Sequence, residues 1–115
     1  MKKLKYVYNK LVRDKIPQEI NKTQGRQANY KVLNESEYLQ ELDKKLFEEA
    51  HEFIEEHSVE ELGDLIEVIL AIMEAKSISI KEVESARKVK RNKKGAFKDK
   101  IYLIDVEQEE NVEKE

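Results

Sequence analysis

The chain of 115 residues contains no cysteine, which excludes disulfide bonds and thiolate metal sites. It has no apolar run near the roughly 20 residues needed to cross a bilayer. Its first residues, MKKLKYVYNKL, lack the apolar core of a signal peptide. We therefore expect a soluble, cytoplasmic protein with no membrane partner.

Apolar residues are also scarce: 39% of the chain is hydrophobic and 41% is charged. A chain of this length forms one domain with a modest core. The composition favours a core shared with a second copy, although a highly charged helical monomer has the same composition. We expect a single domain over residues 1–106, followed by an acidic, disordered tail over residues 107–115.

The net charge of −3 conceals three segments of alternating sign. Residues 1–17 carry six basic residues against Asp14, a net of +5. Residues 35–67 carry 13 acids against two lysines, a net of −11, and residues 81–100 carry nine basic residues against three acids, a net of +6. Basic ends folded around an acidic centre would suit a metal-bound polyphosphate. Solvated charges that complement one another between neighbouring segments explain the pattern at least as well.

Two amphipathic helices are predicted in the acidic centre. Asn34 and Glu37 form a capping box that opens a helix to about His57. Its apolar residues form a narrow stripe: Leu39, Leu42, Leu46, Ala50 and Phe53. A second helix begins after Ser58 and continues past Met73, and its apolar positions span about 200° of its circumference. One neighbouring helix covers less than this, so we expect the second helix to pack against its own chain and against another copy.

These helices carry two carboxylate pairs at a spacing of three residues, Glu49 with Glu52 and Glu61 with Asp64. Helix residues three apart are neighbours on one face. On a helical wheel all four lie on or beside the buried stripes, whereas Glu48 faces solvent. Four converging carboxylates repel one another unless a hard cation lies between them. The pattern therefore predicts a Mg²⁺ site, with Mn²⁺ as the alternative ion.

Two features of the second helix leave alternatives open. Glu61 lies three residues after Ser58, where it can complete a capping box, and an acid in the first turn also suits the helix dipole without any metal. Gly63 costs a helix about 1 kcal/mol relative to alanine. A close approach of another helix would account for this glycine.

The N-terminal segment combines basic residues with a helix signal. Lys10, Arg13 and Lys15 are spaced to face one ligand if the segment is irregular, and a peripheral basic arm is the alternative. Pro17 predicts a short helix through Asn21, because proline fits the first turn of a helix.

The C-terminal part begins with a basic helix, predicted from Ile80 to about Lys93 and ended by Gly95. Residues 101–104 predict a short strand that pairs with an extended segment at residues 30–33 or near Tyr6.

Three motifs together resemble a known superfamily. They are the two carboxylate pairs with Gly63 between Glu61 and Asp64, the opening YNKLVRDKIP at residues 8–17, and KRNKKGAF at residues 90–97 before the terminal strand. This combination resembles the all-α nucleotide pyrophosphohydrolase superfamily, the MazG-like and phosphoribosyl-ATP pyrophosphohydrolase-like proteins, in a small single-domain subgroup. The resemblance covers residues 8–106. The connection between the two helices is shorter than in the longer MazG-type domains.

The resemblance implies a mainly α fold, an antiparallel helix bundle with short peripheral strands near both termini. It also implies a homodimer or homotetramer whose subunits complete one another's core and site. The implied activity is Mg²⁺-dependent hydrolysis of a nucleoside triphosphate, or a related nucleotide pyrophosphate, to a monophosphate and pyrophosphate, as in housecleaning of the nucleotide pool.

The resemblance also implies roles for individual residues. The metal ligands are Glu49, Glu52, Glu61 and Asp64, and the ion would neutralise phosphate charge and activate water. The candidates for the general base are Glu48, Glu49 and Glu56. The candidates for binding substrate phosphates are Lys10, Arg13, Lys15, Arg91 and Lys94.

Two other functions are compatible with these residues. A noncatalytic helical oligomerisation or adaptor module would use its acids only to solvate the bundle, and it would neither bind divalent ions nor release pyrophosphate. A nucleic-acid-binding protein would use the basic segment 87–100. The chain is acidic overall and has no recognised nucleic-acid-binding motif, so no nucleic-acid partner is expected.

Overall fold

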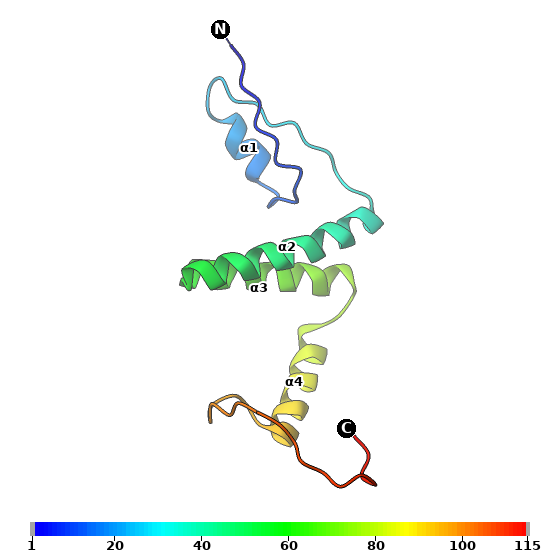
Figure 1. Ribbon diagram of the computed structural model, residues 1–115. Coiled ribbons are helices and arrows are strands. Elements are labelled where there is room, and N and C mark those ends of the chain that lie inside the picture. The colour runs from blue at the N-terminus through cyan, green and yellow to red at the C-terminus, as the bar shows by residue number, and fades with distance from the viewer. Residues whose placement is uncertain (1, 115) are drawn as a thin grey trace. The chain divides into compact units, whose positions relative to one another are not determined.

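The computed structural model describes residues 2–114 and is mainly α, which confirms this part of the predicted fold class, whereas the predicted helix bundle stays a prediction. Its helices are α1 (Ile16–Asn21), α2 (Glu35–Glu56), α3 (Val59–Ala75) and α4 (Ile80–Lys94) (Figure 1). The chain divides into two compact units, one up to Ile80 and one from Lys81 onward. None of the helices in the described residues combines the length and apolarity that crossing a bilayer requires.

Helix α2 begins and ends at the residues predicted from local signals. The Glu37 N–H donates to Asn34 Oδ1 at 2.9 Å, and the Asn34 N–H donates to Glu37 Oε1 at 3.3 Å, which completes the capping box. His57 then adopts a left-handed φ of 53°, and its N–H donates to the Phe53 carbonyl at 2.7 Å. A left-handed residue after the last turn ends a helix, because it redirects the backbone while satisfying a free carbonyl.

Helices α2 and α3 form an antiparallel hairpin. Only His57 and Ser58 separate them, and they lie side by side along their length (Figure 1). The Ser58 hydroxyl accepts from the Glu61 N–H at 3.1 Å and so caps α3. Because the turn is so short, the last turns of α2 face the first turns of α3. The two carboxylate pairs are thereby brought to the same end of the hairpin.

The core between these helices is small. Leu42, at 2% exposure, is buried together with Val68 and Met73, and Glu49 is the one charged residue buried among those described. The remaining residues of the predicted α2 stripe are half-buried: Leu39, Leu46, Ala50 and Phe53. A row of α3 side chains stays at least 40% exposed: Leu62, Ile66, Ile69 and Leu70. The chain itself therefore covers only part of the wide apolar surface of α3.

The flanking helices also follow their local signals. Helix α1 has Pro17 in its first turn, and the Asn21 side chain at its end accepts from the Ala28 N–H at 2.8 Å. Helix α4 ends at Lys94, and Gly95 follows with a φ of 87°, a conformation that glycine adopts at little cost.

The short strands expected near Tyr6, at residues 30–33 and at residues 101–104 are not confirmed, because residues 2–114 contain no strand. An extended segment becomes a strand only when its backbone pairs with another segment, and the sequence pattern reports the tendency without supplying the partner. In the tail, the Gln108 side chain donates to the Val112 carbonyl at 2.7 Å. The predicted disorder of residues 107–115 stays a prediction.

The close helix approach expected at Gly63 is wrong for the described part of the chain. A Cβ built on Gly63 would meet no atom within 4 Å. This residue lies on the exposed side of α3, so packing within the chain does not require a glycine there.

Candidate metal centre

Glu49 is the most unusual residue of the hairpin. Its side chain is 9% exposed, and its Oε1 lies 3.5 Å from the Nζ atom of Lys45, one turn earlier on α2. Its Oε2 is buried and has no hydrogen-bond partner among the described residues. Leaving a buried polar atom unsatisfied costs about 1–3 kcal/mol. The arrangement therefore favours a bound cation or proton at this oxygen.

The four predicted metal ligands are divided between two overlapping groups, one of which also includes Glu48. Oxygen atoms of Glu49, Glu61 and Asp64 lie within 4.8 Å of one another, and so do those of Glu48, Glu49 and Glu52. Glu49 belongs to both groups. The Oε2 of Glu61 is also buried without a partner in the described chain. The hairpin thus brings together the two carboxylate pairs that the sequence spacing singled out.

The electrostatics of these groups favour a positive ion. Burial, followed by the negative charge of Glu52, raises the pKa of Glu49, and the charge of Lys45 opposes the rise. Burial, followed by the charges of Glu52 and Asp64, also raises the pKa of Glu61. A carboxylate with a raised pKa lies where negative charge is in excess, which a divalent ion relieves. An all-oxygen donor set of this kind matches Mg²⁺ or Mn²⁺.

Glu48 differs from its prediction. The helical wheel placed it in solvent, but it is half-buried, because Lys10 Nζ at 3.4 Å and Lys45 Nζ at 3.3 Å both lie against its Oε1. Burial acts to raise its pKa, but hydrogen bonds and charges from Lys45 and Lys10 outweigh it and lower the pKa of Glu48. Glu48 is therefore an ionised carboxylate held by two lysines.

Arg13 reaches the same cluster from the N-terminal segment. Its Nη2 donates to Asp64 Oδ1 at 2.8 Å, and its Nη1 lies 4.0 Å from Glu67 Oε1. Sequence reasoning missed Glu67 and Lys45, although both carried a signal. Glu67 lies three residues after Asp64 and Lys45 lies four before Glu49, which places each on the face of a carboxylate already singled out.

A pocket of about 260 Å³ opens at this cluster. It is lined by Lys10, Val12, Arg13, Ile16, Lys45, Glu49 and Asp64. The pocket places three cationic side chains beside two carboxylates over an apolar edge. This combination can hold a phosphate whose charge is shared between a metal ion and basic groups.

Two predicted site residues lie elsewhere in this unit. Glu56 is exposed at the end of α2 and belongs to neither carboxylate group. Lys15 is exposed at the start of α1 and is not among the residues that line the pocket.

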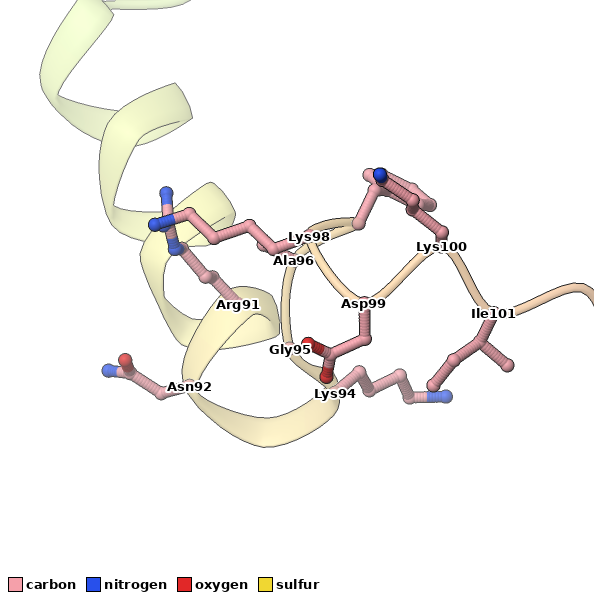
Figure 2. Close-up of a pocket in the computed structure, with 10 residues that line it drawn as sticks. Arg91, Asn92, Lys94, Gly95, Ala96, Lys98, Asp99, Lys100 and Ile101 are labelled. Atoms are coloured by element: carbon pink, nitrogen blue, oxygen red, sulfur yellow. The ribbon is translucent and has the colours of Figure 1, made fainter.

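Arg91 and Lys94 belong to the second unit, where they line a separate pocket of about 440 Å³. Figure 2 shows Arg91 and Asn92 on the last turn of α4 and residues 98–101 across the turn that follows. Lys98 and Lys100 add positive charge to the lining, and Asp99 is its one acid. The excess of positive charge makes this pocket suitable for an anion.

Comparison of the chain with models of protein families, with curated proteins and with solved structures finds no match in any of the three. The functional conclusion therefore depends on the carboxylate cluster, its basic neighbours and the sequence motifs.

Proposed function

We propose that the protein is a Mg²⁺-dependent nucleotide pyrophosphohydrolase. It would convert a nucleoside triphosphate, or a related nucleotide pyrophosphate, to a monophosphate and pyrophosphate. The observation that carries the proposal is the environment of Glu49. This buried carboxylate belongs to two ligand groups and has basic side chains beside it, and its Oε2 has no hydrogen-bond partner within residues 2–114. The proposed architecture is the antiparallel pyrophosphohydrolase-like bundle, of which the α2–α3 hairpin is the centre.

The residues that would hold the ion are Glu49, Glu52, Glu61 and Asp64. Mn²⁺ would bind the same oxygen donors. When bound, the ion would neutralise phosphate charge and acidify a coordinated water.

Basic side chains of the pocket would bind the phosphates. The Arg13 guanidinium presents a fork of donors that matches two phosphate oxygens, and Lys10 provides a second charge from the same segment. Both already lie at the carboxylates, so a phosphate held there would be within their reach. Arg91 and Lys94 keep the same proposed role within the pocket of their own unit.

The general base is best assigned to Glu49. Among the candidates, Glu56 lies outside both carboxylate groups, and Glu48 is engaged by two lysines that lower its pKa and so weaken it as a base. Glu49 is the candidate that belongs to both carboxylate groups, and its raised pKa makes it the better proton acceptor.

A second copy of the chain would complete the core. The exposed row of Leu62, Ile66, Ile69 and Leu70 continues the apolar surface of α3 beyond what α2 covers. A contiguous apolar row on a small protein is typical of an interface between subunits. The row equally favours the alternative function, a noncatalytic oligomerisation or adaptor module, so activity has to separate the two.

The test is an assay of canonical and modified nucleotides with Mg²⁺ for release of pyrophosphate and monophosphate. The Glu61→Gln and Asp64→Asn variants should lose at least 100-fold in rate, about the effect of removing one electrostatic contact to the reacting group. Glu55→Gln is the matched control, because Glu55 is exposed and pairs with His51 at 3.6 Å. Wild-type activity in a folded Asp64→Asn variant would show that the site is assigned wrongly. If the wild-type protein releases pyrophosphate from none of the nucleotides, the adaptor function is favoured.

A further inference from the structure

The ion pair between Arg13 and Asp64 places one cationic group on a carboxylate of the proposed metal site. The Nη2 to Oδ1 distance is 2.8 Å, and the two residues are 51 positions apart in the chain. Asp64 shares its ligand group with Glu49 and Glu61, so the guanidinium offsets part of the repulsion within that group.

The surroundings of Arg13 allow its side chain to change partner. The Arg13 carbonyl accepts from the Ile16 N–H at 3.1 Å, which holds the backbone at the start of α1. The side chain itself is 56% exposed and lines the pocket. The exposed, forked side chain can therefore reach either the Asp64 carboxylate or an anion in the pocket by changing its rotamer.

We propose that Arg13 is an exchangeable counterion: it neutralises Asp64 while the metal site is empty and transfers to a substrate phosphate when the metal-bound nucleotide enters. This inference rests on the proposed function. A bound divalent ion takes over the neutralisation of Asp64, which weakens the attraction that holds Arg13 there. The same residue therefore opposes binding of the metal alone and favours binding of the metal with a polyphosphate.

Two binding measurements test the exchange, and neither depends on catalysis. Calorimetric titration of Mn²⁺ alone measures the affinity of the carboxylates for the ion. Titration of inorganic triphosphate at saturating Mn²⁺ measures the phosphate contact and does not require the correct base. Arg13→Gln removes the charge, and Arg13→Lys keeps it without the fork. Arg87→Gln is the matched control, because Arg87 pairs with Glu84 within α4.

The two affinities should change in opposite directions. Arg13→Gln should bind Mn²⁺ alone about two- to fivefold more tightly, the range of an exposed ion pair. It should bind triphosphate roughly tenfold more weakly, as expected for a lost charge-assisted contact. Arg13→Lys should keep the wild-type Mn²⁺ affinity and weaken triphosphate binding less, and Arg87→Gln should change neither.

The outcomes separate this inference from the proposed function. A wild-type protein that binds no Mn²⁺ overturns the proposed function and the exchange with it. If the wild type binds Mn²⁺ but Arg13→Gln changes both affinities in the same direction, or changes only one, the exchange is wrong and the metal site stands. Thermal unfolding of each variant without metal shows that the compared proteins are folded.

Discussion

Lys45 Nζ lies 3.5 Å from Glu49 Oε1, and both side chains are mostly buried, one helical turn apart on α2. The second oxygen of Glu49, Oε2, has no hydrogen-bond partner among residues 2–114. One lysine thus satisfies half of a buried carboxylate that also faces Glu52. A metal ion bound at the other oxygen, Oε2, would therefore stabilise the hairpin.

Replacing Lys45 by methionine should make folding depend on a divalent ion. The variant leaves Glu49 without the one cationic contact that residues 2–114 give it, and leaves Glu48 with Lys10 alone. We therefore expect a loss of about 1–3 kcal/mol in the free energy of unfolding without metal. Saturating Mg²⁺ should restore most of this loss. Urea denaturation with EDTA or with Mg²⁺ measures both effects.

Lys22→Met is the control for this change, because Lys22 is 69% exposed and pairs with Glu19, which is itself 55% exposed. Equal destabilisation of the two variants would show that the Lys45–Glu49 contact has no special role.

The metal-free protein should become more stable as the pH falls from 7 toward about 5. The folded-state pKa values of Glu49 and Glu61 are raised, so in this range the folded state binds more protons than the unfolded state. Their contribution to stability is therefore fully present below the unfolded pKa and is lost as the pH rises through the folded pKa. Differential scanning calorimetry with EDTA should show Tm rising on acidification.

Glu48 has a lowered pKa and acts in the opposite direction, but its contribution is lost only as the pH falls below its ordinary value. Mg²⁺ should reduce the rise in Tm, since the ion and the protons compete for the same oxygens. A double variant with Glu49→Gln and Glu61→Gln should show no rise in Tm on acidification. A Tm that falls steadily from pH 7 to 5 in the metal-free wild type would contradict the proposal that protonation of Glu49 and Glu61 stabilises the folded state.

Gly63→Ala should stabilise the protein by about 1 kcal/mol, because the glycine lies inside a helix and its added methyl group meets open space. Urea denaturation measures the change. Gly25→Ala is a contrasting control: Gly25 has a φ of 86°, where alanine is strained, so this variant should be destabilised. A destabilised Gly63→Ala protein would indicate that a second copy packs against this side of α3.

Ile69→Glu should break the proposed association between copies. Ile69 lies in the exposed row of α3, and a carboxylate there would be desolvated in any interface that covers the row. Light scattering coupled to size exclusion should show a mass reduced to that of one chain. Val32→Glu is the control, because Val32 is 90% exposed in the loop before α2. A wild-type protein that is already monomeric at high concentration would contradict the proposal that a second copy covers the exposed row of α3.

The helix boundaries were predictable from the sequence, because each depends on groups only a few residues apart. Asn34 and Ser58 cap their helices with their own side chains, and Pro17 and Gly95 act through backbone conformation. The two carboxylate pairs were predictable for the same reason, since a spacing of three puts residues on one helical face.

The predictions were incomplete where distant segments meet. Glu48 faces outward on an isolated helix, yet Lys10, from 38 positions earlier, covers it. Gly63 suggested a close contact that the described chain does not make. A helical wheel reports direction on one helix and contains no information about which other segment arrives there.

The sequence by itself determined four helices and the faces on which their acids lie, because hydrogen bonding and helical period act locally. Only the tertiary structure decided that Glu49 joins both carboxylate groups and that Arg13 pairs with Asp64. These contacts depend on how the hairpin closes and where the N-terminal segment crosses it. Both follow from burial of apolar surface and the balance of charge over the whole unit.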